Sequence, residues 1–280
     1  MLLASPKETL DLIFATQQFR QVALSPDGGQ VAWVEARPNA DRTPSSNSAI
    51  FFRAAAGGTP QRLTAGNGTA LADEHGLAWS RNGRQLAFLS DREKPGQLQL
   101  YVVPANGGPA RQLTHLTGYA AEPKWSPDGK TIALLNIPES TDRAGAVEAA
   151  ARETGEIAET YTEQRLVLVD AASGATRTVS PVDTYVYEYD WSPNSRQFAV
   201  ISAKGNGDNN WWIARLGVLD ANGGTPREIF RPQTQIAVPR WSADGKASMC
   251  KSWKNCAGKG LSAPASTGKS TNWTNRPPWT

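Results

Sequence analysis

The sequence predicts an all-β fold, a β-propeller of four-stranded blades, and two alternating repeats carry this prediction. The first repeat is an apolar pair, a turn of the Ser-Pro-Asp-Gly type and a short apolar strand. Its five copies begin at Val22, Leu77, Pro123, Tyr189 and Pro239. The second repeat is a strand, a glycine-containing turn and Arg-x-Leu-Thr or a variant, and its four copies begin at Ile50, Leu100, Leu166 and Leu216. Strict alternation of the two indicates about four and a half blades, an incomplete ring.

Each repeat has the residues that a tight β-turn requires. In the first copy Pro26 presets φ, and Asp27 followed by Gly28 supplies the reversal between two apolar segments. The second repeat has Gly57 and Gly58 at the corresponding reversal. Each repeat therefore predicts a hairpin, and two hairpins make one four-stranded sheet.

Tryptophan recurs just before four of the turns, at Trp79, Trp125, Trp191 and Trp241, with steps of 46, 66 and 50 residues. These steps lie close to the ~40–50 residues of a propeller blade. We expect these tryptophans and the Leu, Ile and Val strands to form the core between neighbouring blades, because one blade alone buries only part of its apolar surface. The alternative is a β-sandwich whose turns are similar by accident.

The step of 66 residues indicates an insert in the third blade. Residues 141–164 are rich in Ala and Glu, which favour helix. Glu153, Glu156 and Glu159 are candidate substrate-binding residues, as an acidic wall for the N-terminal ammonium of a peptide. The alternative is a solvated surface helix.

Two later segments depart from the repeat. Residues 205–210 are polar and predict a loop, after which Trp211 and Trp212 are expected to start the next strand; an aromatic patch for a partner is the alternative. After Lys246 the expected strand is missing, and residues 247–280 contain no Asp or Glu. We therefore assign residues 8–246 to the propeller and residues 247–280 to a basic, low-complexity tail that is disordered or frameshifted.

The composition argues against several classes of protein. The net charge of +3 without a basic patch argues against a nucleic-acid partner, and no apolar run approaches the ~20 residues of a membrane span. The start of the chain has no signal-peptide pattern, so a cytoplasmic location is expected as written, or a periplasmic one if the N-terminus is misassigned. Cys250 and Cys256 match no standard zinc spacing, and no metal site, cofactor or disulfide framework is expected.

No catalytic residue is expected in this chain. A serine hydrolase of the α/β class needs a Gly-x-Ser-x-Gly elbow, and the nearest match, at residues 260–264, lacks the last glycine. The only histidines are His75 and His115, and each is expected to be a plain surface residue.

The repeats resemble the TolB-type propeller repeat and, further, the N-terminal propeller of the prolyl oligopeptidase family of serine peptidases. The acylaminoacyl-peptidase and dipeptidyl-aminopeptidase branch is the most similar. The resemblance rests on Trp-Ser-Pro-Asp-Gly-Lys at 125–130, on the run at 186–193 and on the strand–Gly-Gly–Arg-x-Leu-Thr units, and it covers roughly residues 8–246.

In that family the propeller caps a C-terminal hydrolase domain, which holds the catalytic triad, and admits short peptides. The resemblance implies that this chain is a non-catalytic propeller portion that gates peptide access, with the catalytic domain absent from it. Its partners would be peptides or a hydrolase domain. The alternative function is a TolB-like scaffold that binds protein partners, and open blade faces would also allow self-association.

Overall fold

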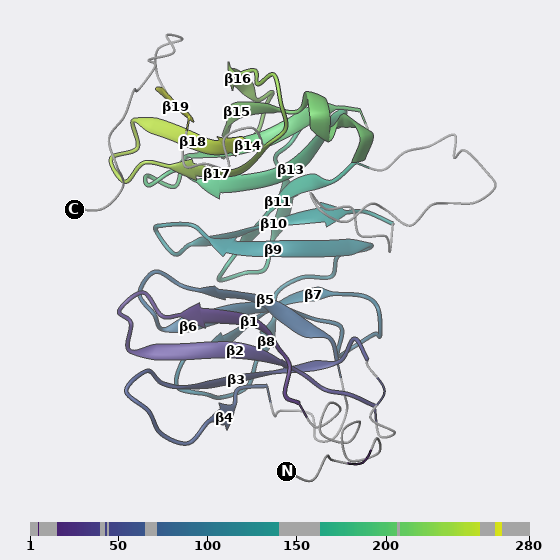
Figure 1. Ribbon diagram of the computed structural model, residues 1–280, viewed down its shortest axis with the longest axis vertical. Helices are drawn as coiled ribbons and strands as arrows, with labels where there is room; N and C mark the ends of the chain where they lie inside the picture. Colours follow the sequence, from purple (N-terminus) through teal and green to yellow (C-terminus); the bar gives the residue numbers. More distant parts are fainter. Residues whose placement is uncertain are drawn as a thin grey trace, which may run out of the picture. The chain divides into compact units, whose positions relative to one another are not determined.

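The computed structural model of the protein describes residues 5, 16–39, 43, 45–64, 72–139, 163–205, 208–252 and 261–264. In these ranges the strands form five antiparallel sheets, four of them four-stranded (Figure 1). The predicted all-β architecture of four-stranded blades is confirmed. The chain divides into two compact units, Met1–Thr114 and His115–Thr280, and each is described by itself.

Unit 1 contains two sheets, and each is a meander in which neighbouring strands follow one another in the chain. The first sheet consists of β1 (Phe19–Leu24), β2 (Gln30–Ala36), β3 (Ser48–Ala54) and β4 (Gln61–Arg62). The second sheet consists of β5 (Glu74–Trp79), β6 (Gln85–Ser90), β7 (Gln99–Pro104) and β8 (Arg111–Gln112).

Unit 2 contains three sheets of the same design. The third sheet consists of β9 (Tyr119–Trp125), β10 (Thr131–Ile137), β11 (Arg165–Asp170) and β12 (Thr176–Thr178). The fourth consists of β13 (Thr184–Trp191), β14 (Gln197–Lys204), β15 (Arg215–Asp220) and β16 (Arg227–Phe230). The fifth consists of β17 (Ile236–Trp241), β18 (Ala247–Ser252) and β19 (Leu261–Pro264).

The serine of the first repeat closes the turn from inside. The Ser25 hydroxyl donates to the Asp27 carboxylate at 2.5 Å and accepts the Gln30 N–H at 2.9 Å. The same serine-to-Asx bond recurs in the other four turns, from Ser80, Ser126, Ser192 and Ser242 to Asn82, Asp128, Asn194 and Asp244. All five turns therefore share one hydrogen-bond pattern. Asp and Asn are interchangeable in it because only the Oδ1 acceptor is needed.

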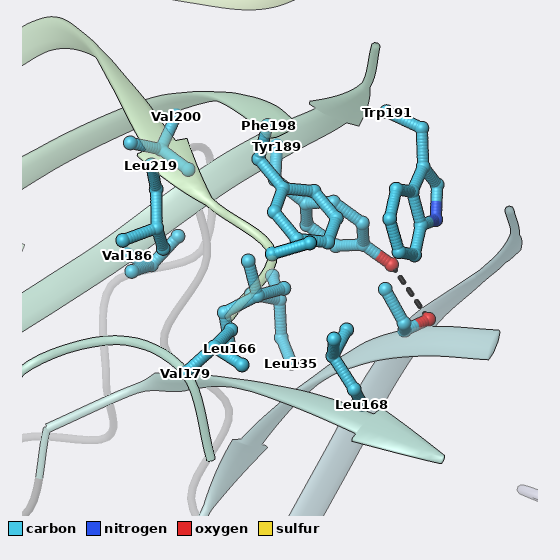
Figure 2. Packing of buried hydrophobic residues seen from close by; sticks show 12 residues of the cluster. Leu135, Leu166, Leu168, Val179, Val186, Tyr189, Trp191, Phe198, Val200 and Leu219 are labelled. Carbon is cyan, nitrogen blue, oxygen red and sulfur yellow. Dashed lines mark hydrogen bonds between the residues drawn. The ribbon is translucent and has the colours of Figure 1, made fainter. Parts of the chain in front are cut away.

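The core lies between facing sheets of the same unit, as predicted for the aliphatic strands and the tryptophans. In unit 1 the Trp79 indole N–H donates to the Ala23 carbonyl at 3.1 Å, and in unit 2 that of Trp191 donates to the Lys124 carbonyl at 3.1 Å. Each tryptophan therefore packs against the preceding sheet and also bonds to its first strand. Figure 2 shows aliphatic side chains of the fourth sheet facing those of the third, including Val186, Val200, Leu219, Leu135, Leu166 and Leu168.

A buried ion pair connects the two sheets of unit 1 through polar groups. The Glu74 carboxylate receives a hydrogen bond from Arg92 at 2.7 Å and another from the Thr64 hydroxyl of the preceding sheet. Its side chain is 4% exposed and that of Arg92 is 11% exposed. Arg92 also lies over the Tyr101 ring, 4.7 Å from its centroid. Burial raises the pKa of Glu74, and the bonds from Thr64 and Arg92 oppose that rise.

The structure corrects two expectations. A strand does follow Lys246, since β18 pairs with β17, although its chemistry differs from that of the other blades. Ser248 stands opposite Trp241, where Leu86 stands opposite Trp79, and within the described part of the chain its buried hydroxyl has no partner. The expectation of a missing strand was wrong because the Asp-Gly turn and pairing with β17 are enough to form a strand from residues that lack a strong apolar pattern. The disordered or frameshifted tail otherwise falls mainly outside the described residues.

The second correction concerns Trp211 and Trp212, which were expected to start a strand. They lie instead in a short 3-10 helix, η2 (Asp208–Ile213). Trp211 is buried against Tyr187, with ring centroids 4.6 Å apart, whereas Trp212 is exposed. One indole is thus a core residue, and adjacent tryptophans at a 3-10 spacing point in different directions.

Candidate functional site: the first strands of unit 2

The first strand of each blade is interrupted by a β-bulge. The register shifts in β5, β9, β13 and β17, and the residues Gly76, Glu122 and Val238 at three of these bulges have positive φ. Positive φ is unfavourable for Glu and especially for the β-branched Val. The surrounding packing must hold these residues in place, so the bulges are built features that re-aim side chains.

In unit 2 the residues three positions and one position before the tryptophan of each first strand are mostly charged. We name this set the first-strand charge cluster. It consists of Glu122, Lys124, Glu188, Asp190 and Arg240 on β9, β13 and β17 (Figure 1). The carboxylate of Glu122 lies 3.2 Å from the Lys124 ammonium, so opposite charges neighbour each other within it.

Lys124 connects the third and fourth sheets. Its ammonium donates to the Tyr189 carbonyl at 2.7 Å and lies 4.4 Å from the centroid of the Tyr189 ring. The Tyr189 hydroxyl donates in turn to the Ala133 carbonyl at 2.8 Å (Figure 2). Burial raises the pKa of that hydroxyl well above its ordinary value, so Tyr189 stays neutral and acts as a fixed strut.

Two carboxylates join the fourth and fifth sheets. Glu188 accepts the backbone N–H of Val238 at the bulge, and Asp190 accepts that of Trp241 at 2.9 Å. Burial raises the pKa of Glu188, the Val238 N–H opposes the rise, and the nearby Glu122 carboxylate adds to it. Glu188 is therefore a half-buried carboxylate whose proton affinity depends on neighbouring charge.

Unit 1 builds the same joint from neutral groups. The side-chain oxygen of Gln21 accepts the backbone N–H of Leu77 at 2.9 Å, as Glu188 does for Val238. The positions that correspond to the cluster in unit 1 are Gln21, Ala23, Gly76 and Ala78. The backbone joint does not itself require charge, so the charges of unit 2 are available for another role.

The predicted substrate-binding residues Glu153, Glu156 and Glu159 lie outside the described residues, as does most of the predicted insert at 141–164. Sequence analysis missed the first-strand charge cluster. A signal for it exists, because a charged residue directly precedes the tryptophan in three copies, as Lys124, Asp190 and Arg240. Its meaning depended on the bulges, which the pattern of apolar residues does not reveal.

Neither of the two histidines belongs to this cluster. The His75 ring nitrogen Nδ1 lies 3.1 Å from the Asp73 carboxylate and is half-buried, while His115 is exposed. Across the described ranges, no three His, Cys, Asp or Glu side chains gather closely enough to hold a metal ion. No helix in the same ranges has the length and apolar character of a membrane span.

The cluster can recognise a ligand that carries both donors and acceptors. Its carboxylates accept hydrogen bonds, its Lys and Arg donate them, and the termini and backbone of a peptide offer both kinds of partner. Binding by oppositely charged groups on rigid strands is therefore the chemistry that this arrangement supports.

Comparisons with known proteins agree with the fold. The TolB beta propeller domain model matches residues 19–165. The uncharacterized peptidase YuxL of Bacillus subtilis (strain 168) is 33% identical over 124 residues, which are 44% of this chain and 18% of YuxL. The uncharacterized protein Atu1656 of Agrobacterium fabrum is 25% identical over 242 residues, 85% of this chain and 71% of that protein.

Among solved structures, puromycin hydrolase superposes with a TM-score of 0.63 at 17% identity, over 98% of this chain and 41% of that chain. This chain thus spans less than half of that enzyme and less than a fifth of YuxL. The predicted resemblance to TolB-type repeats and to the propellers of prolyl oligopeptidase-family peptidases is confirmed. The chain belongs to the TolB β-propeller domain family.

Proposed function

We propose that this chain is the propeller portion of a serine peptidase of the prolyl oligopeptidase family and that it gates peptide access to a hydrolase domain. The observation that carries the proposal is the 33% identity to the peptidase YuxL, of which the matched part is only 18%. Most of such a peptidase lies outside the propeller match, which leaves ample length for a hydrolase domain.

The first-strand charge cluster is where we propose that peptides contact the propeller. Glu188 and Arg240 offer opposite charges, and Lys124 is held in place by its bond to Tyr189. A peptide passing this edge would exchange hydrogen bonds with groups that are already fixed, so little side-chain ordering is required on binding. The chain contributes recognition, and the nucleophile belongs to the hydrolase domain.

The peptidase assignment is tested on the native protein. An antibody raised against the propeller would be used to isolate the polypeptide from its source, followed by labelling with a fluorophosphonate probe, which reacts with activated serines. We expect a labelled polypeptide longer than 280 residues and no labelling of the isolated chain. An unlabelled native polypeptide without peptidase activity would contradict the assignment.

The location of peptide contact is tested separately on the chain itself. Charge-neutral variants Glu188→Gln and Arg240→Gln should weaken binding of a fluorescent unblocked hexapeptide about 3- to 10-fold each, since hydrogen bonds to charged groups contribute about 1 kcal/mol or more. The matched control is Arg53→Gln on the outer part of the first sheet, which should leave the affinity unchanged. Equal affinities for all three variants would place the contact elsewhere.

A second candidate is a TolB-like scaffold that binds protein partners. The match to Atu1656 favours it, because this chain covers 71% of that protein and leaves less than a third of it for any other domain. Under this alternative the isolated native polypeptide carries no reactive serine and co-purifies with a defined partner. The fluorophosphonate experiment therefore separates the two candidates.

A further inference from the structure

A cavity of about 220 Å³ opens on one face of the fourth sheet, at the strand ends far from the Ser-Pro-Asx turn. It is lined by Thr184, Ser202, Lys204, Gly217, Pro226 and Glu228, among others. The volume is below the ~300 Å³ at which pockets for drug-sized ligands begin. A single ring-sized group is the appropriate occupant by size.

The repeat explains why there is space at this point. Gly217 pairs with Val200 in the sheet register, at the position where Tyr101 pairs with Phe88 and Phe51 pairs with Trp33 in unit 1. Both unit 1 sheets place an aromatic ring there, and glycine places none. The cavity therefore lies where both sheets of unit 1 place a ring, whereas the third sheet has Val167 there, opposite Leu134.

The rings of unit 1 each lie under a cation. Arg37 lies 5.0 Å from the Phe51 centroid, and Arg92 lies 4.7 Å from the Tyr101 centroid. Lys204 occupies the same place in the repeat, ten residues after the Asx of the turn, and lines the cavity. The fourth sheet thus retains the cationic side chain while lacking the ring.

The rim of the cavity adds polar groups of both signs. The Arg215 guanidinium donates to the Glu228 carboxylate at 2.8 Å, and Ser202 pairs with Arg215 across β14 and β15. Pro226 provides an apolar wall, as Pro60 does beside Phe51 in the first sheet. An apolar floor with a polar rim suits a side chain that carries an aromatic ring on a peptide backbone.

We propose that this cavity binds the aromatic side chain, phenylalanine or tyrosine, of a polypeptide ligand, with its ring beside Gly217 where Phe51 and Tyr101 place theirs. The site lies on a sheet face and does not involve the first-strand charge cluster, so it stands whether or not the chain belongs to a peptidase. The ligand ring takes the place of the ring that the repeat supplies in both sheets of unit 1.

The test uses the full chain and N-acetyl-phenylalanine amide as the probe, followed by backbone NMR. We expect saturable shifts at the amides of Ser202, Gly217 and Glu228 with a dissociation constant on the order of 1 mM, as befits a ligand of this size. The cyclohexylalanine analogue, of similar shape but without a π-system, should bind about 2- to 5-fold more weakly. Shifts scattered over the surface, or none in these residues, would overturn the proposal.

Variants of residues that line the cavity provide a second test of the proposal. Gly217→Phe should fill the cavity with its own ring and weaken binding of the probe at least tenfold. A Cβ at this position would lie 3.2 Å from the Pro226 Cβ and 3.3 Å from the Arg227 carbonyl oxygen, so both residues must shift slightly. If Gly217→Phe fails to fold, Lys204→Met supplies the test. It should weaken the aromatic probe about 2- to 5-fold without affecting the cyclohexyl analogue, while the remote control Lys130→Met changes neither. Unchanged binding in the folded variants would contradict the site.

Discussion

The two units of this chain build blades from one repeat but place their charged residues differently. Unit 1 buries a charged pair, Glu74 and Arg92, between its sheets, and its residues at the positions of the first-strand charge cluster are neutral. Unit 2 places charges along its first strands, and Lys204, at the repeat position of Arg92, has a side chain that is 82% exposed. The backbone of a blade tolerates both solutions, which indicates that charge in unit 1 acts on stability and charge in unit 2 is available for binding.

The largest effect should come from breaking the buried pair. Arg92→Met leaves the Glu74 carboxylate buried with Thr64 as its remaining side-chain partner, and we expect a loss of about 3 kcal/mol in the free energy of unfolding. The matched variant in unit 2, Lys204→Met, should change it by less than about 0.5 kcal/mol because surface pairs contribute little. Urea unfolding monitored by circular dichroism measures both.

The same variant has a defined pH dependence. Burial raises the pKa of Glu74 in the folded state, so its carboxyl group favours folding at low pH and opposes it as the pH rises through the folded pKa. Removing Arg92 strengthens this trend. Lowering the pH from 7 toward the pKa of Glu74 should therefore restore part of the stability lost in Arg92→Met, and equal losses at both pH values would contradict the role of that carboxylate.

A second comparison contrasts two buried serines of unit 2. Ser126 closes its turn through bonds to Asp128 and Thr131, whereas the hydroxyl of Ser248 is unpaired in the described structure. We expect Ser126→Ala to destabilise the protein by about 1 kcal/mol and Ser248→Ala to leave it unchanged or stabilise it by up to about 1 kcal/mol. Thermal unfolding measures whether each variant is more or less stable than the original protein. Equal destabilisation by both would mean that the Ser248 hydroxyl is satisfied in solution.

A smaller effect is expected at the last position of the turn. Gly129 has a φ of 73°, and its equivalent Ser195 has a φ of 61°. Gly129→Ala should cost about 1 kcal/mol through backbone strain alone, since a Cβ there meets no other atom within 4 Å. Ser195→Gly should gain less than that, because the Ser195 hydroxyl accepts the Asp128 N–H at 3.0 Å. A gain of a full 1 kcal/mol would show that this bond contributes nothing.

The smallest effect concerns acid sensitivity of the turns. Hydrogen bonds from Ser25 and Ser242 lower the pKa of Asp27 and Asp244, so the stability these carboxylates provide is present above their unfolded pKa and is lost as the pH falls through the folded pKa. The double variant Asp27→Asn and Asp244→Asn should flatten the decline of the melting temperature below pH 4. An unchanged decline would assign acid sensitivity to other groups.

The blades were predictable from sequence because their signals are local. The serine-containing turns and the recurring tryptophan depend on a few consecutive residues, and both are confirmed. The ion pair of Glu74 with Arg92 was not predictable, since Glu74 lies on β5 and Arg92 in the turn after β6, and its contribution to stability depends on burial. The bulges at Glu122 and Val238 were missed for a similar reason, because a positive φ at a non-glycine residue is imposed by packing.

The strand after Lys246 shows the opposite error. Its residues lack the apolar alternation of the other blades, and a strand forms there because hydrogen bonding to β17 outweighs a weak pattern. Within the described residues, the Ser248 hydroxyl and the Trp241 indole N–H are both unpaired. These two unpaired groups are the energetic cost of building a strand from a segment of weak apolar pattern. The frameshift hypothesis remains a prediction, and sequencing the gene through the codon for Lys246 tests it.

The central claim, that peptides contact the first strands of unit 2, is tested most directly by hydrogen–deuterium exchange of the chain with and without a saturating unblocked hexapeptide. We predict slower exchange in peptic fragments that contain Glu122, Glu188 and Arg240, and no change in those that contain Gln21 and Ala78. Protection of unit 1 first strands, or no protection in unit 2 at saturation, would contradict the account.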